Sequence, residues 1–333
     1  MNLGEIIKAK FTPVDQETEP ETWLKLRTTG IGGSDAGAIM GMNKYSSPLT
    51  VYMQKKGIDG FKGNLSTEWG HILEDPIRKK TAGELGIDIC TVPGMYTSEE
   101  YPFMNANLDG LCHADHQVEV GGKVVEGWGG HEIKTSATGD GFTSDEIPDS
   151  YYCQVQHYMA VTGLNWFILT VFFLNTKQGR HYVIPRNNDF IYSKLIPAEK
   201  DFWENYVLAE NIPEPIGVDS ELEYIKNLPV DEQITLDADA EEIIAAEREI
   251  DKQIKELSKQ QAELKNKILL KLAELSIGFD KADKTTAIGQ NYRLTYNTQV
   301  RKSIDSESLK KAGLYDQYTK ESSSKVMRIS EVR

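Results

Sequence analysis

The sequence lacks the features of a secreted, disulfide-linked or membrane-spanning protein. Only three of its 333 residues are cysteines, Cys90, Cys112 and Cys153, and their wide spacing suits neither a disulfide framework nor a zinc pair. No run approaches the roughly 18 apolar residues that a membrane-spanning helix needs. The N-terminal segment has no apolar stretch behind a basic start, as a secretory signal would. We therefore expect reduced cysteines and a cytoplasmic protein with no membrane partner.

An excess of positive charge is also lacking. The chain has 37 Lys and Arg residues against 51 Asp and Glu residues, a net charge of −14. Residues 219–263 hold 14 acids and five bases, a net charge of −9, which leaves only −5 for the rest of the chain. Polyanion binding usually draws on clustered Lys and Arg, but nucleases also need acids to hold their metals. Net charge alone therefore does not exclude a nucleic-acid substrate.

Helical and strand-like segments are mixed along residues 1–217. Helical spacing is expected for residues 20–27, 34–40, 48–56, 66–85, 148–162 and 189–211. Alternating, β-branched segments predict strands over residues 89–97, 105–113, 117–120, 124–135, 166–174 and 179–185. Ser34 follows a glycine-rich turn and is expected to cap the second helix. This order predicts one domain of the α/β (α+β) class, with a mixed central sheet flanked by helices.

A change of composition at Pro213–Gly217 predicts a boundary, so that residues 218–333 form a second region. A helix of about ten turns is expected over residues 240–275. Its apolar residues recur every seven positions, at Ile243, Ile250, Leu257 and Leu264, with a second row at Ile254, Gln261, Ile268 and Leu275. This pattern is typical of a coiled coil or a helical arm. Strands over residues 285–288, 292–298 and 325–329 and a helix over residues 306–312 would form a small α+β element after it.

Acidic and basic side chains that can carry chemistry follow one another through the first region. Glu74 lies within a helix, and Asp109 lies at the end of a strand beside a glycine. Glu132 and Lys134 share a strand, where alternation places both on one face and Ile133 on the other. Carboxylates that converge with a lysine predict a magnesium phosphodiesterase site, because hard oxygen ligands suit Mg²⁺ or Mn²⁺.

Each group would have a separate role in such a site. Two ions would activate a water and stabilise the leaving oxygen, and the backbone carbonyl of Ile133 is a candidate extra ligand. Lys134 would orient or deprotonate the water and offset phosphate charge. Gln154 and Tyr158, four residues apart, share a helix face. Taken alone, this last pair is equally consistent with packing against a core.

The whole series resembles the RecB-type motifs of the PD-(D/E)xK superfamily and, more narrowly, the YqaJ viral recombinase family, to which the lambda-type exonucleases are related. The likeness begins at Trp23-Leu-Lys-Leu-Arg27-Thr-Thr-Gly30-Ile-Gly-Gly-Ser34-Asp35. It continues through Trp69-Gly70, Leu108-Asp109-Gly110, Glu132-Ile-Lys134 and Gln154-Val-Gln156. Residues 20 to about 210 are covered.

This resemblance implies a restriction-endonuclease-like core and a Mg²⁺-dependent 5′-to-3′ exonuclease that converts double-stranded DNA ends into 3′ single-stranded tails for recombination. It further implies a ring-shaped trimer that works beside a single-strand annealing protein, in a phage or prophage of a bacterial host. By position, Asp109 and Glu132 would be metal ligands and Lys134 the catalytic lysine, with Glu74 and Gln154 supporting metals or water.

The same resemblance assigns Arg27 and Ser34 to the terminal 5′ phosphate of the DNA. An arginine fork suits a phosphate dianion, and a helix N-terminus adds a favourable dipole. A sister group of nucleases carries an iron–sulfur cluster on four cysteines, which three cysteines cannot supply. Two alternatives stay open: an endonuclease on the same core, and an inactive scaffold whose coiled coil recruits a recombination partner.

Overall fold

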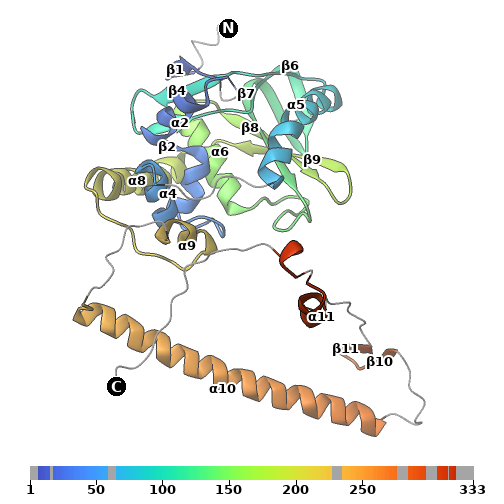
Figure 1. Ribbon diagram of the computed structural model, residues 1–333. Coiled ribbons are helices and arrows are strands. Elements are labelled where there is room, and N and C mark those ends of the chain that lie inside the picture. Colours follow the sequence, from blue (N-terminus) through green and yellow to red (C-terminus); the bar gives the residue numbers. More distant parts are fainter. Residues whose placement is uncertain are drawn as a thin grey trace. The chain divides into compact units, whose positions relative to one another are not determined.

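The computed structural model describes residues 7–15, 18–58, 65–226, 235–275, 284–297, 306–313 and 315–319. The chain divides into two compact units, residues 1–229 and residues 230–333. Figure 1 shows the strands and helices of the first unit and the long helix of the second. Among the described helices, none has the length and apolar content needed to cross a bilayer.

A five-stranded mixed sheet forms the centre of the first unit. Its strands, in spatial order, are β3 (Asp88–Cys90), β6 (Gly110–Val120), β7 (Lys123–Ser136), β8 (Trp166–Phe173) and β9 (Gln178–Pro185). All neighbours are antiparallel except β7 and β8, which run parallel. Parallel neighbours need a crossover, and α6 (Asp149–Thr162) lies within it. The predicted α+β class with a mixed sheet is therefore confirmed.

Within the described residues, a smaller four-stranded sheet and four helices precede α6. The small sheet has the order β1 (Ala9–Pro13), β4 (Gly94–Ser98), β5 (Met104–Ala106) and β2 (Ile31–Gly32). The helices are α2 (Pro20–Thr28), α3 (Gly33–Ile39), α4 (Pro48–Lys55) and α5 (Leu65–Leu85). Residues 188–208 form one helical stretch of α7 (Asn188–Phe190), η1 (Ile191–Leu195), α8 (Ile196–Phe202) and η2 (Trp203–Leu208). The helices expected from the sequence are thus present.

The predicted strand over residues 105–113 is divided in the structure. Residues 104–106 belong to the small sheet as β5, and the next strand begins only at Gly110. That strand, β6, continues to Val120 through an irregularity between Ala114 and Val118, so it includes the separately predicted strand over residues 117–120. Asp109 consequently lies in the connection between two sheets. Such a connection leaves a side chain free to face a cleft.

The core forms where α6 packs on the central sheet. Phe167 and Leu169 of β8 are fully buried, as are Val155 and Met159 of α6. The predicted apolar strand over residues 166–174 is therefore confirmed as a buried central strand. Burial on both faces explains why its sequence is continuously apolar rather than alternating.

The first unit extends beyond the expected boundary at residue 217. Helix α9 (Asp219–Ile225) packs on α4 and buries Tyr224, which is 2% exposed. Gln54 Nε2 donates to the Tyr224 hydroxyl at 2.9 Å, and Ser220 Oγ donates to the Tyr45 carbonyl at 2.8 Å. Proline and glycine end the preceding helix there, but the chain still contributes to the core afterwards.

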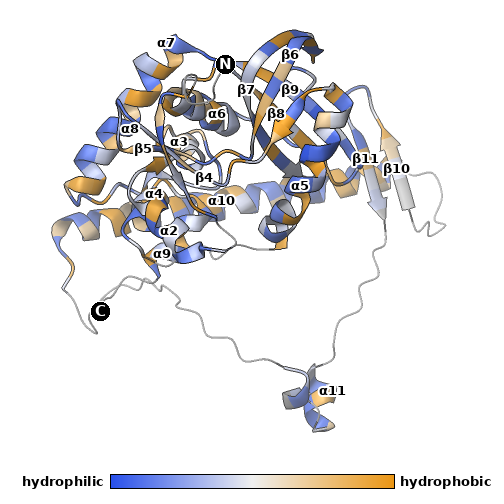
Figure 2. Cartoon of the chain, turned by 90° about the horizontal axis from the view of Figure 1, so that it is seen from above, coloured by the Kyte–Doolittle hydropathy of each residue, from blue (hydrophilic) through white to orange (hydrophobic). Residues whose placement is uncertain are grey.

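The second unit contains α10 (Ala238–Leu275), the hairpin of β10 (Lys284–Ile288) and β11 (Arg293–Asn297), and the short helices α11 (Ser306–Lys311) and η3 (Tyr315–Gln317). The predicted long helix is confirmed, and within the described part of the chain none of its residues is buried. Figure 2 shows apolar and polar residues interspersed along it. The strand expected over residues 325–329 lies outside the described residues.

Candidate active site

The structure brings all nine residues singled out in the sequence to one cleft of about 410 Å³ in the first unit. They come from α2, α3, α5, the β5–β6 connection, β7 and α6. The nine are Arg27, Ser34, Glu74, Asp109, Glu132, Ile133, Lys134, Gln154 and Tyr158. Segments more than a hundred residues apart therefore meet at one place, as the ordered motif series predicts.

Strand register places Asp109 beside Glu132. Gly110 of β6 pairs with His131 of β7, so the preceding residue on one strand lies near the following residue on the other. The backbone N–H of Ile133 donates to Asp109 Oδ2 at 2.8 Å, which fixes the carboxylate. Arg78 of α5 donates from Nε to the Asp109 carbonyl at 3.2 Å. Both the carboxylate and the backbone carbonyl of Asp109 are thus held.

Glu132 and Lys134 lie on the same face of β7, as strand alternation predicts. Lys134 Nζ lies 2.6 Å from Glu132 Oε1. The ammonium also lies over the Tyr151 ring, 5.0 Å from its centroid, so its position is restricted from two sides. Glu132 is 2% exposed, whereas the Lys134 side chain is 21% exposed. The lysine can therefore contact a substrate directly. The buried glutamate would contact one only through a bound ion or water.

Gln154 and Tyr158 complete this cluster from α6. Gln154 Nε2 donates to Glu132 Oε1 at 2.7 Å and to the Tyr158 hydroxyl at 2.8 Å, which uses both amide hydrogens. A Cβ on Gly33 of α3 would lie 2.3 Å from the Tyr158 ring, so this glycine permits the close approach of α3 to α6. The four-residue spacing of Gln154 and Tyr158 on α6 thus places them in the site, and Tyr158 also packs in the core.

One acceptor of the cluster is left without a partner. Glu132 Oε1 receives both Lys134 and Gln154, but the buried Glu132 Oε2 has no hydrogen-bond partner among the described residues. A buried carboxylate oxygen without a donor is costly, and in native structures it commonly marks a functional position. A hard cation such as Mg²⁺, which prefers oxygen ligands, would be a suitable partner for Glu132 Oε2.

The electrostatics of the cleft also favour a cation. Burial raises the pKa of Glu132 to about 8, and the neighbouring Asp109 carboxylate adds to the effect. Burial likewise raises the pKa of Asp109 and of Glu74. Burial alone would lower the pKa of Lys134, but the Glu132 and Asp109 carboxylates raise it above its usual value. Three carboxyl groups thus lie near a single lysine, and their raised pKa values mean that they hold protons more readily than free carboxyl groups do. A divalent ion bound there would displace these protons.

The donor set fits a magnesium ion better than a transition metal. No three His, Cys, Asp or Glu side chains within the described residues are close enough to enclose an ion by themselves. Mg²⁺ needs no such enclosure, because one or two carboxylates and several waters suffice. Asp109, Glu132 and the Ile133 carbonyl would supply that incomplete set. Glu74 lies farther out, with a 35% exposed side chain that pairs with His71 Nδ1 at 3.2 Å.

Arg27 and Ser34 line the same cleft and contact each other. Arg27 Nη2 donates to Ser34 Oγ at 3.0 Å, and the guanidinium carbon lies 4.9 Å from the centroid of the Trp23 ring. The prediction that Ser34 caps α3 is wrong, because the helix begins one residue earlier and Gly32 is its N-cap. Asp35, three residues beyond the cap, accepts from the Gly32 N–H at 2.8 Å and so provides the capping carboxylate.

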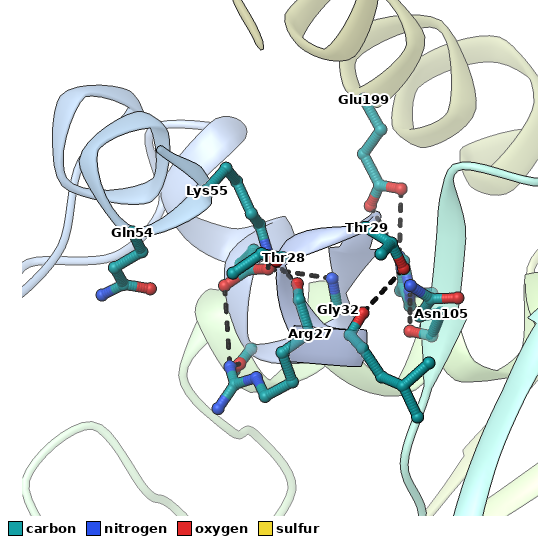
Figure 3. A network of polar contacts seen from close by, with 12 residues as sticks. Arg27, Thr28, Thr29, Gly32, Gln54, Lys55, Asn105 and Glu199 are labelled. Carbon is teal, nitrogen blue, oxygen red and sulfur yellow. Dashed lines mark hydrogen bonds and ion pairs between the residues drawn. The ribbon is translucent and has the colours of Figure 1, made fainter. Parts of the chain in front are cut away.

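Sequence reasoning missed the buried ion pair behind Arg27. Lys55 Nζ of α4 lies 2.6 Å from Asp35 Oδ2 and also donates to the Arg27 carbonyl at 2.9 Å (Figure 3). Burial raises the pKa of Asp35, but the cations of Lys55 and Arg27 lower it below its usual value. The ionised pair therefore joins α2, α3 and α4. The position of Asp35, three residues after the N-cap Gly32, was the only local sign of this ion pair in the sequence.

A second missed pair holds α6 in place. His157 Nδ1 lies 2.8 Å from Glu199 Oε1 of α8, and His157 Nε2 lies 2.9 Å from the Asn105 carbonyl of β5. Glu199 and Asn105 appear in Figure 3 on either side of this contact. Both side chains of the pair are fully buried. His157 follows Gln154 by three residues, so this anchor fixes the helix that presents Gln154 and Tyr158.

Asp109 of the β5–β6 connection and Glu132 and Lys134 of β7 thus line one cleft, as the ordered motifs predict. Residues 22–165 match the family model of the YqaJ-like viral recombinase domain. Over these residues the chain is similar to that domain, and the resemblance predicted from its motifs is confirmed. The whole of the match lies in the first unit, which contains the cleft.

Three known proteins are similar to this chain. The uncharacterized protein YqaJ of Bacillus subtilis is 29% identical over 341 residues, covering 98% of each chain. The alkaline exonuclease LHK-Exo of Laribacter hongkongensis is 19% identical, covering 57% of this chain and 94% of its own, with a TM-score of 0.42. A phage-related exonuclease of Haemophilus somnus is 15% identical, covering 56% and 99%, with a TM-score of 0.36.

Proposed function

We propose that this protein is a Mg²⁺-dependent exonuclease that degrades the 5′-ended strand of double-stranded DNA and leaves 3′ tails for phage-type recombination. The observation that carries the proposal is the cluster of Asp109, Glu132 and Lys134 in the cleft, where the buried Glu132 Oε2 has no hydrogen-bond partner among the described residues. The YqaJ-like domain supports it, as do the named activities of the similar exonucleases.

Each residue of the cluster would have a distinct role. Asp109, Glu132 and the Ile133 carbonyl would hold Mg²⁺, for which Mn²⁺ would substitute. The ion, when bound, would supply Lewis-acid activation of water and neutralise phosphate charge. Lys134 would donate to a phosphate oxygen and orient the water, which its raised pKa favours because the ammonium form persists at neutral pH. Gln154, held by Tyr158, would keep Glu132 in position, and Glu74 would support the outer part of the site.

Arg27 and Ser34 would select the end of the strand. The guanidinium is supported by the Trp23 ring and by its hydrogen bond to Ser34 Oγ, and Lys55 holds the Arg27 backbone carbonyl, so the remaining N–H groups have a defined direction. A terminal 5′ phosphate is a dianion, whereas an internal phosphate carries one charge. Paired N–H donors discriminate in favour of the former. The terminal phosphate would then be bound, and the strand cleaved, in the same cleft.

Several wider properties follow from the family resemblance. We propose a trimer as the working assembly, a single-strand annealing protein as partner, and a location in the cytoplasm of a bacterium that carries the phage or prophage. No iron–sulfur cluster is proposed, since Cys112 and Cys153 are buried thiols in the core and Cys90 lies exposed on β3.

Incubation with linear and covalently closed circular DNA, each with Mg²⁺ or with EDTA, tests the activity. Degradation of the linear DNA alone, abolished by EDTA, is expected. Cleavage of both substrates would replace the exonuclease with an endonuclease on the same core. Cleavage of neither, by a protein that binds Mg²⁺ and DNA, would favour the scaffold reading.

A further inference from the structure

Helix α10 carries an apolar stripe that the described residues leave uncovered. The stripe occupies the a and d positions of a heptad repeat. The a positions are Glu247, Ile254, Gln261, Ile268 and Leu275, and the d positions are Ile243, Ile250, Leu257, Leu264 and Lys271. All seven apolar members are at least 46% exposed. We call these ten positions the seam.

Burying such a seam is what stabilises a long isolated helix in water, since helix propensity alone contributes little. The polar seam positions indicate which partner fits. Glu247 stands near one end of the seam and Lys271 near the other, with Gln261 between them. A charge at a core position is costly unless the facing residue compensates it, so these residues constrain the orientation of any second helix.

A parallel pairing of two copies would oppose like charges. In that arrangement each seam residue faces its own counterpart, so Glu247 would meet Glu247 and Lys271 would meet Lys271. An antiparallel pairing with Glu247 opposite Lys271 places every apolar seam residue except Leu257 opposite another apolar residue. The remaining facing pairs are then Ile254 with Leu264, Ile250 with Ile268, Ile243 with Leu275 and Leu257 with Gln261. Sliding one helix by a heptad instead leaves Glu247 facing Leu264 and Lys271 facing Ala240.

The charges outside the seam favour the same orientation. Apart from Glu247, residues 238–256 contain six acids and three bases, and apart from Lys271, residues 257–275 contain two acids and three bases. An antiparallel pair places the acidic half of each helix against the basic half of the other. Lys271 already pairs with Glu274 at 2.9 Å, but both side chains are more than half exposed, so exchanging this contact costs little.

We propose that α10 pairs with α10 of a second copy of this chain as an antiparallel two-stranded coiled coil, with Glu247 of each copy opposite Lys271 of the other. The contact spans residues 243–275 and is about 50 Å long. The two-fold symmetry makes the interface self-complementary, with both charge pairs formed at once. This inference does not depend on the proposed nuclease activity. Because a two-fold contact pairs two helices and the proposed trimer has three, the contact would link chains of different trimers.

Site-directed cross-linking in the full chain tests the pairing. One preparation carries Glu247→Cys and the other Lys271→Cys, both with Cys90→Ser because Cys90 is the exposed native thiol. After mixing and oxidation, the expected product joins residue 247 of one chain to residue 271 of the other. These two positions are about 36 Å apart along a single helix, so no bond within one α10 can mimic it. Products joining 247 to 247, or no product between chains, would overturn the proposal.

A charge exchange provides the second measurement, by sedimentation equilibrium of the full chain. Glu247→Lys alone, or Lys271→Glu alone, should weaken self-association by about tenfold, because two like-charged pairs then face each other. The double variant should restore it. Glu249→Lys makes the same charge change on the outer face and serves as the matched control. Failure of the double variant to restore association, or an equal loss in the control, would contradict the antiparallel register.

Discussion

The first unit and α10 use apolar residues in opposite ways. In the first unit, Phe167 and Leu169 are fully buried, and the polar groups of the cleft are held by named partners. In α10 the apolar residues Ile243 and Leu257 are 70% and 63% exposed. An apolar pattern therefore describes a completed core in one region and an unfilled interface in the other. On this comparison we propose chemistry for the first unit and assembly for α10.

The largest effect is expected at Lys134. Lys134→Ala should lower the cleavage rate by about 10³-fold while Mg²⁺ and DNA binding persist, because the ammonium acts on the reacting phosphate and holds no metal. Rates of nucleotide release and calorimetric Mg²⁺ binding measure the two properties separately. Asp109→Ala should lose both. Lys123→Ala, on the same strand but bonded to the Val183 carbonyl, is the matched control. Near-normal turnover of Lys134→Ala would remove the lysine from the mechanism.

Arg27 should affect the choice of DNA end. Arg27→Ala is expected to slow digestion of 5′-phosphorylated ends by about 10- to 100-fold, because the charge-assisted hydrogen bonds to the dianion are lost. Digestion of 5′-hydroxyl ends should slow much less. Parallel rate measurements on the two substrates give the comparison. Equal slowing would indicate a general contact to the DNA backbone and leave the terminal-phosphate role without support.

The boundary between the two regions can be located by comparing the thermal stability of chains that end at different residues. A chain ending at residue 217 loses α9 and with it the buried Tyr224, whereas a chain ending at residue 229 keeps both. The shorter chain should melt several degrees lower, since loss of a large buried side chain costs about 3 kcal/mol or more. Thermal unfolding of both chains decides this. Identical melting temperatures would place α9 outside the first unit.

A smaller effect concerns the proton held by Glu132. Its pKa is raised from 4.5 to about 8 in the folded protein, so its contribution to stability is full below pH 4.5 and is lost as the pH rises through 8. Without metal, Glu132→Gln should therefore gain stability relative to the native chain as the pH rises across that interval, by about 1.4 kcal/mol for each unit by which the pKa is raised. Denaturant titrations at several pH values measure the difference. A constant difference would mean that Glu132 is ionised throughout.

Much of the site could be predicted from the sequence because its residues follow local rules. Strand alternation places Glu132 and Lys134 together, and helical spacing places Gln154 with Tyr158. The ordered motifs located Asp109, although the exact ends of its strand were wrong because residues 104–106 join a different sheet. Family resemblance, not local pattern, supplied Arg27.

The supporting contacts could not be predicted because they join distant segments. Asp35 and Lys55 are 20 residues apart, and His157 and Glu199 are 42 apart. Each is an ordinary charged or polar residue until the fold buries it against its partner. Likewise, the cluster of Pro and Gly at 213–217 correctly ended a helix, but only the packing of α9 revealed that the core continues.

The most direct test of the comparison is the Mg²⁺-dependent digestion of linear duplex DNA by a chain ending at residue 229. The rate per active site should match that of the full chain, provided that the truncated chain shows a cooperative thermal transition. Loss of activity in a truncated chain that is folded would show that the second unit takes part in the chemistry, and would contradict the separation of cleavage from assembly.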